Sequence, residues 1–216
     1  MKINYQTKQE LLHLLNTKKM LGIEHVKQID LSQYYNKRHK LPIDIVGLFD
    51  YVSNCSLCEL SKSKISCEFS QGNNKSEIFI IHTYLNKESQ KEYLDLKNMI
   101  EERLKININD IYMTNILKCN VKKLNDNLDE EIKKCIPYLE QQIVLLKPKI
   151  IITFGNAFRY LMNNDDNITD ISGNLFIYND IKVIPLLNID FINKNPSYKE
   201  KMDKDLEKIK NILEKK

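Results

Sequence analysis

Three short apolar runs rich in β-branched residues constrain the fold of this chain more than any other feature. They occupy Ser76–Thr83 (SEIFIIHT), Asp110–Leu117 (DIYMTNIL) and Lys149–Gly155 (KIIITFG). Near-continuous apolar runs of this length are typical of strands that are buried on both faces. Helical patterns separate them, at 87–105 and at 128–146. Strands that alternate with helices favour a mostly parallel sheet covered by helices on both faces.

The rest of the chain fits this α/β class. The segment NLFIYNDIKVIPLL predicts a hairpin around Asn179 and Asp180, and apolar residues at helical spacing predict an amphipathic closing helix near 202–213. The first 50 residues read as helical, with a polar, basic stretch just before Pro42. We therefore predict a helical extension at 1–40 and the main domain at 41–216.

Composition sets only broad limits on function. The chain has 33 Lys and Arg against 29 Asp and Glu, and its net charge of +4 permits a nucleic-acid partner without requiring one. The N-terminus lacks a signal-peptide pattern, and no window approaches the ~20 apolar residues of a membrane span. We expect a cytoplasmic protein with no membrane partner.

The cysteines are the most informative chemical feature. Five thiols in a reducing cytoplasm are not expected to form disulfides, and the odd count leaves four for one site. Cys55 and Cys58 form a CxxC, Cys119 follows a predicted strand, and Cys135 comes after fifteen intervening residues, within a helix. Thiolates from such scattered positions suit a cuboidal Fe–S cluster. The spacing alone equally allows scattered buried thiols. Cys67 is the odd thiol beside the four, with the alternative that it takes the place of one of them as a ligand.

The segment around the last two of these cysteines resembles a known family. TNILKC, fifteen further residues, and then CIPYLEQQIVLLKPKIIITFG are similar to the iron–sulfur uracil-DNA glycosylases of bacteria and archaea, which typically read TNxxKCRPP and CxPYLxxQIxLIKPKVIVxLG. Weaker similarity extends the match to about 45–216. The resemblance implies a three-layer α/β/α fold around a mostly parallel four-stranded sheet. It also implies a structural [4Fe–4S] cluster held by Cys55, Cys58, Cys119 and Cys135, and removal of a flipped uracil from DNA by N-glycosidic hydrolysis.

The resemblance further suggests which residues contact the substrate. Asn115 stands where the family reads uracil, and its amide can both donate and accept, although an Asn here can also satisfy backbone groups. The family's GEAPG loop reads IHTYL, so His82 replaces the glutamate, and its HPSxLLR motif reads NIDFINK, so Asn188 replaces the histidine. His82 and Asn188 are the candidate catalytic residues. Tyr84 and Tyr93 are candidates to stack on uracil, with ordinary packing as the alternative.

Four lysines are candidate phosphate contacts. Lys122 and Lys123 lie where the family carries RPPxNR, Lys118 precedes them beside Cys119, and Lys194 lies near the position of the family's duplex-probing arginine. A solvated loop explains these charges equally well. We expect DNA as the partner, either single-stranded or as a uracil-containing duplex, and residues 1–40 as the docking element for a protein partner.

The sequence leaves rival functions open. The first is a [4Fe–4S] protein that binds DNA and excises uracil in base-excision repair, which the retained Asn115 favours. The second is a catalytically inactive member that serves as a DNA-binding or protein-interaction module, which the two degenerate motifs favour. A third is an enzyme for another substrate, with His82 in a repurposed pocket. The state of the pocket separates them, because Tyr84 or Leu85 would exclude catalysis by filling it.

Overall fold

The structure is a computed structural model, and it describes residues 15–17, 19–20, 41–84, 90–123 and 127–214. The chain divides into two compact units, Met1–Leu41 and Pro42–Lys216. In the first unit, the residues described at 15–17 and 19–20 are helical. The remainder of the predicted helical extension lies outside the described residues, so its boundary and its role in docking stay predictions.

Six described strands of the second unit form one sheet in the order β2-β4-β3-β6-β8-β7. The central four are parallel: β4 (Tyr112–Asn115), β3 (Ile78–His82), β6 (Ile150–Phe154) and β8 (Ile181–Leu186). The two edge strands are antiparallel: β2 (Gln71–Gly72) and β7 (Phe176–Tyr178). The predicted α/β fold with a parallel four-stranded core is confirmed, and the edge strands extend that core to six.

The predicted hairpin is also confirmed. β7 and β8 pair across a turn in which Asn179 has φ 48° and Asp180 has φ 68°. Both angles lie in the left-handed region, which Asn and Asp tolerate better than other residues with a side chain. A separate antiparallel ribbon joins β1 (Ser66–Cys67) to β5 (Cys119–Asn120), with Cys67 directly opposite Cys119.

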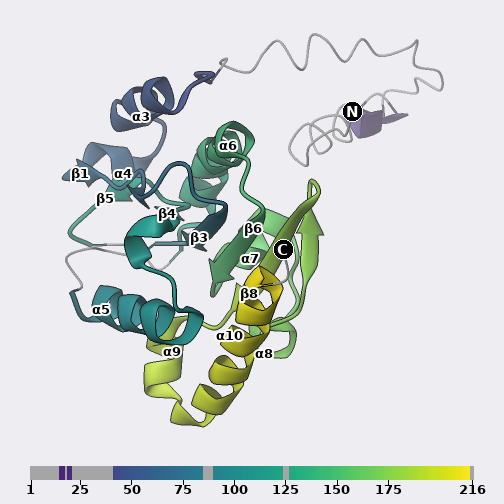
Figure 1. The fold of residues 1–216 in the computed structure, drawn as a ribbon. Helices are drawn as coiled ribbons and strands as arrows, with labels where there is room; N and C mark the ends of the chain where they lie inside the picture. The colour runs from purple at the N-terminus through teal and green to yellow at the C-terminus, as the bar shows by residue number, and fades with distance from the viewer. Residues whose placement is uncertain (1–14, 18, 21–40, 85–89, 124–126, 215–216) are drawn as a thin grey trace. The chain divides into compact units, whose positions relative to one another are not determined.

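Helices cover both faces of the sheet (Figure 1). On one face lie α5 (Gln90–Met99), its π-helical continuation η1 (Ile100–Leu104), α9 (Ile189–Lys194) and α10 (Lys199–Glu214). On the other lie α4 (Glu59–Lys62), α6 (Asp129–Leu146) and α7 (Ala157–Met162). The shorter or peripheral elements are α3 (Ile45–Ser53), η2 (Ile108–Asp110), α8 (Ile168–Ile171) and η3 (Pro196–Tyr198).

Successive residues of β3 show how the sheet fills both layers. Ile80 packs with the helices of the first face, whereas Phe79 and Ile81 pack with those of the second, and all three are fully buried. Full burial of such a side chain contributes about 1.5–3 kcal/mol. No helix in the described part of the chain is long and apolar enough to cross a membrane.

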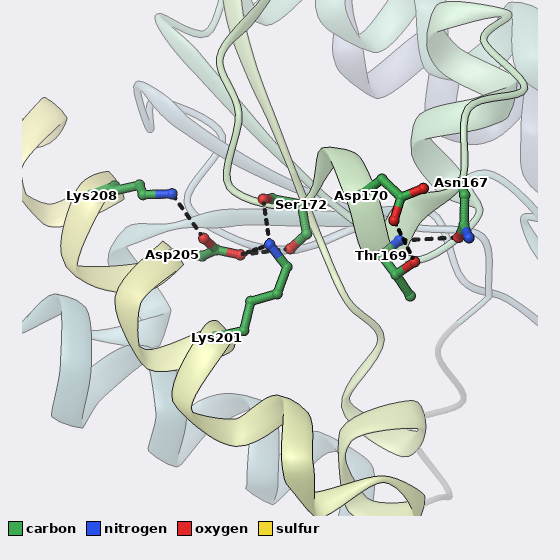
Figure 2. A network of polar contacts seen from close by, with 7 residues as sticks. All are labelled: Asn167, Thr169, Asp170, Ser172, Lys201, Asp205 and Lys208. Carbon is green, nitrogen blue, oxygen red and sulfur yellow. Dashed lines mark hydrogen bonds and ion pairs between the residues drawn. The ribbon is translucent and has the colours of Figure 1, made fainter.

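A buried carboxylate holds the closing helix in place (Figure 2). Asp205 of α10 is 1% exposed; it accepts a hydrogen bond from Ser172 Oγ at 2.8 Å and pairs with Lys208 Nζ at 3.2 Å. Lys201 Nζ lies 3.6 Å from the same carboxylate and donates to the Ser172 carbonyl at 3.1 Å. Gly173, with φ +78°, passes so close that an added Cβ would lie 2.0 Å from Asp205 Oδ1.

Candidate functional site

A pocket of about 440 Å³ lies at the carboxyl ends of the parallel strands β3, β6 and β8. This edge of an open α/β sheet is where ligands usually bind, and the volume suits a small molecule. The lining side chains come from the strand ends, from α7 and from the start of α6: His82, Thr83, Tyr84, Asn127, Leu128, Asp129, Ile132, Phe154, Asn156, Tyr160 and Asn188. Three residues predicted from sequence, His82, Tyr84 and Asn188, therefore share one pocket.

His82 is the most unusual of these side chains. It is 5% exposed and stacks on Phe154, with ring centroids 4.8 Å apart and planes at 8°. Burial lowers its pKa to about 3, so the imidazole is neutral at pH 7. Among the described residues, its Nε2 has no hydrogen-bond partner. A buried polar atom without a partner costs about 1–3 kcal/mol.

Asp129 is a pocket residue that sequence reasoning missed. Its Oδ1 accepts a hydrogen bond from the Tyr160 hydroxyl at 2.7 Å, and its backbone N–H donates to Asn127 Oδ1 at 3.0 Å. The sequence signal was an acidic residue in the first turn of a predicted helix. Acidic residues are common there because they stabilise the helix dipole, so the signal did not single out Asp129.

The other two predicted pocket residues are held by neighbours. Tyr84 donates from its hydroxyl to Asn120 Oδ1 at 3.2 Å. Its side chain lines the wall of the pocket and does not fill it. Leu85 lies outside the described residues. Asn188 caps α9, where its Oδ1 accepts from the Asp190 N–H at 3.2 Å. That amide oxygen is therefore already used at the helix end.

The four predicted cluster cysteines are close enough to influence one another's pKa values electrostatically. Cys58, Cys119 and Cys135 are buried, and Cys55 is half-buried with its Sγ 3.2 Å from the Tyr138 hydroxyl. The pKa of Cys119 is raised to about 12, first by burial and then by the nearby Cys135, Cys58 and Cys55. Burial also raises the pKa of Cys135 to about 11, with further contributions from Cys58 and Cys55.

The chemistry of this donor set suits an Fe–S cluster, whose irons are held by thiolates. Within the described ranges, no group of three His, Cys, Asp or Glu side chains converges closely enough to hold one metal ion. A cuboidal cluster carries its irons at separate corners, so its four thiolates need not converge on a point. All five cysteines are free; Cys58, Cys119 and Cys135 belong to one core cluster, and Cys55 is near enough to affect the pKa of Cys119.

A comparison with known proteins decides the family. The model of the Uracil DNA glycosylase superfamily matches residues 73–214. This chain belongs to that superfamily.

Relatives within the superfamily cover most of the chain. The type-4 uracil-DNA glycosylase of Saccharolobus solfataricus is 28% identical over 188 residues, which are 79% of this chain and 86% of the relative. The type-4 enzyme of Sulfurisphaera tokodaii is 26% identical over 178 residues, 74% of this chain and 81% of the relative. The type-4 enzyme of Thermotoga maritima is 24% identical over 176 residues, 76% and 92% of the two chains.

Two residues that the superfamily resemblance suggested as substrate contacts do not line the pocket. Asn115 ends β4 directly beside His82 in the sheet register and is 6% exposed, one strand away from the pocket wall. Tyr93 packs against the core of the α5 face, and its hydroxyl accepts a hydrogen bond from Gln71 Nε2. Tyr93 is therefore part of that core, and the prediction that it stacks on uracil is wrong for this pocket.

The prediction that Lys118 contacts a DNA phosphate is also wrong. Its side chain is 1% exposed, and Nζ donates to Thr114 Oγ1 and Gln142 Oε1, both at 2.6 Å. Nζ also lies 5.5 Å from the centroid of the Phe69 ring. Burial lowers the pKa of Lys118 to about 7, a shift that the nearby Cys135 and Cys67 partly oppose. The surrounding side chains form a closed polar pocket for the ammonium group, which keeps it away from DNA.

The other predicted phosphate contacts differ in their surroundings. Lys122 and Lys123 are exposed just after β5. Lys194 forms an ion pair with Asp190 at 2.6 Å on the exposed side of α9. Lys122 and Lys123 therefore remain the better candidates for DNA contact.

Proposed function

We propose that this chain is a [4Fe–4S] uracil-DNA glycosylase that acts in base-excision repair. It takes a flipped uracil into the pocket at the ends of β3, β6 and β8 and hydrolyses the N-glycosidic bond. The observation that carries the proposal is the buried, neutral His82, whose Nε2 has no partner among the described residues and which lines an open pocket. Membership of the superfamily supports the substrate class.

His82 suits the departure of the base. As the bond between C1′ and N1 breaks, negative charge develops on the uracil carbonyl oxygens. A neutral imidazole N–H can donate to such an oxygen, and removal of one donor of this kind typically costs about 10²–10³ in rate. Stacking on Phe154 fixes the ring plane before the substrate arrives, so little reorganisation is needed.

We propose that Cys55, Cys58, Cys119 and Cys135 hold the [4Fe–4S] cluster. When bound, the cluster supplies a rigid cross-link between the CxxC segment, β5 and α6 and no redox chemistry in the excision step. The thiols release their protons on binding, and the raised pKa values of Cys119 and Cys135 make that release strongly pH-dependent. Cys67 lies opposite Cys119 in the β1–β5 ribbon and is left outside the proposed ligand set.

DNA binding rests on surface charge in this proposal. Lys122 and Lys123 would pair with phosphates beside the pocket. Base flipping would cost a few kcal/mol of unstacking, and this cost is smaller for a mispaired uracil than for a normally paired base. A cytoplasmic location, and docking of a protein partner on residues 1–40, remain part of the proposal.

Two observations favour the catalytically inactive alternative. The Asn188 amide oxygen caps a helix where the superfamily motif carries a histidine, and Asn115 is absent from the pocket lining. A member without these two contacts would still bind DNA through its lysines.

Uracil release decides between the two functions. The substrates are single-stranded and U·G duplex oligonucleotides, and the protein is purified anaerobically with its iron content and its ~400 nm absorbance measured. Glycosylase activity predicts release that falls at least about 10²-fold in His82→Gln. Lys182→Ala, an exposed change at the amino end of β8, should leave release unchanged. No release from a protein with a full cluster and salt-dependent DNA binding would establish the inactive alternative.

A further inference from the structure

We infer that Asp129 is a catalytic carboxylate of this pocket, which holds the attacking water and faces the sugar as positive charge develops on it. The inference rests on the proposed function and supplies the acidic group that the IHTYL segment lacks. Asp129 is half-buried, and its side chain lines the same pocket as His82. The pocket would then carry a hydrogen-bond donor for the base and a carboxylate for the sugar.

Tyr160 fixes the orientation of this carboxylate. Its hydroxyl comes from α7, a different helix, and donates to Asp129 Oδ1 at 2.7 Å. The pKa of Tyr160 is raised, first by burial and then by its bond to Asp129, so the hydroxyl stays protonated at neutral pH. Within the described residues, no hydrogen bond to Asp129 Oδ2 is present. One carboxylate oxygen is therefore held, and the other remains open to a water.

Helix stability alone does not explain this arrangement. Asp129, Glu130 and Glu131 all lie in the first turn of α6, where any acid favours the helix dipole. Glu130 pairs with Lys133 at 2.8 Å on the exposed side, and neither Glu130 nor Glu131 lines the pocket. Asp129 alone of the three is held by a second helix. His82, which is 95% buried and whose Nε2 has no partner among the described residues, lines the same pocket.

The hydrolysis balances with these two groups. The bond between C1′ and N1 breaks and its electron pair leaves with uracil, whose oxygen accepts a hydrogen bond from His82. The oxygen of the water forms the new bond to C1′. The Asp129 carboxylate takes one proton from that water and later returns it to the uracil anion. A carboxylate in this role typically contributes about 10²–10⁴ in rate.

Single-turnover release of uracil from a U·G duplex tests the role directly. Asp129→Asn keeps the volume and the bond from Tyr160, and we expect release to slow by about 10²–10³ with DNA affinity unchanged. Glu131→Gln removes a charge from the same helix turn, lies outside the pocket, and should release uracil like the wild type. Tyr160→Phe should lower kcat by about tenfold without changing KM, because it misorients the carboxylate rather than the DNA.

A binding measurement separates this inference from the proposed function. One duplex carries a pyrrolidine abasic analogue, whose ring amine is cationic, and a matched duplex carries neutral tetrahydrofuran. The wild type should prefer the cationic duplex by about tenfold in fluorescence anisotropy, and Asp129→Asn should remove the preference. If the wild type releases uracil, and Asp129→Asn releases it equally fast and keeps the preference for the cationic duplex, the inference is overturned and the function stands. A preference that depends on Asp129 without any release would overturn the function and with it the catalytic role, and leave Asp129 as a carboxylate that only faces the cation. Neither release nor preference would overturn both.

Discussion

The imidazole of His82 lies flat against the ring of Phe154, with centroids 4.8 Å apart and an angle of 8° between the planes. β3 and β6 are parallel neighbours, and the two residues face each other in the register, so the sheet itself brings the rings together. The contact buries the imidazole at the floor of the pocket, which is why its neutral form is favoured.

This burial makes stability depend on pH. The pKa of His82 is lowered from 6.5 to about 3, so between these values the unfolded chain binds a proton that the folded chain does not. The free energy of unfolding should therefore fall as the pH drops from 6.5 towards 3, by up to about 1.4 kcal/mol per pH unit from this residue. Urea unfolding of the wild type and His82→Gln between pH 4.5 and 7.5 measures the difference. The free energy of unfolding of the wild type minus that of His82→Gln should decrease as the pH falls. Parallel pH curves for the two proteins would contradict the lowered pKa of His82.

The proposed cluster predicts which cysteines retain iron. Wild-type protein prepared anaerobically should hold about four iron atoms per chain, and Cys135→Ala should lose most of them. Cys67→Ala is the matched control, because Cys67 lies opposite Cys119 yet outside the proposed ligand set, and it should keep its iron. Iron analysis and the ~400 nm absorbance give the result. Equal loss in both variants would argue against this ligand set.

Removal of two exposed lysines should weaken DNA binding in a salt-dependent way. The double variant Lys122→Ala/Lys123→Ala should reduce the slope of log K against log salt by about 0.9 for each duplex phosphate that the protein no longer neutralises. Lys182→Ala, equally exposed but at the amino end of β8, should not change the slope. Fluorescence anisotropy across a salt series measures both. A slope unchanged in the double variant would place the DNA on another surface.

Gly173 should resist substitution because of Asp205. An alanine Cβ would lie 2.0 Å from Asp205 Oδ1, and φ +78° is itself unfavourable for alanine. We expect Gly173→Ala to destabilise by about 2–4 kcal/mol, and Asp205→Ala by about 2–3 kcal/mol. In the Asp205→Ala background the glycine substitution should cost at least about 1 kcal/mol less, which a double-mutant cycle by urea unfolding would measure. Additive effects would show that the close approach is not the cause.

Much of the fold follows from local pattern. The run IFIIH became β3 and IIITF became β6, because long apolar, β-branched segments have few alternatives to a central strand. The two-residue strands β1, β2 and β5 escaped prediction, since two residues are too few to show a period.

The site was less predictable, because its geometry depends on contacts between distant segments. Lys118 reads locally as a charged residue after a strand, yet Gln142 and Phe69, 24 and 49 residues away, enclose it. From sequence, Asp129 is an acid that stabilises the start of a helix, and its hydrogen bond from Tyr160, 31 residues away, appears only in the structure. His82, Tyr84 and Asn188 could be placed from the family resemblance, and all three line the pocket at the carboxyl ends of the strands, the ligand edge of such a sheet.

The β1–β5 ribbon stands apart from the six-stranded sheet and consists of two residue pairs. Damage by oxygen to the proposed cluster would therefore loosen this ribbon first. A preparation bleached in air would still melt cooperatively, since the core on the α5, α9 and α10 face contains none of the proposed ligands. A normal thermal scan of this protein would then say nothing about whether the sample is still fit for an activity assay.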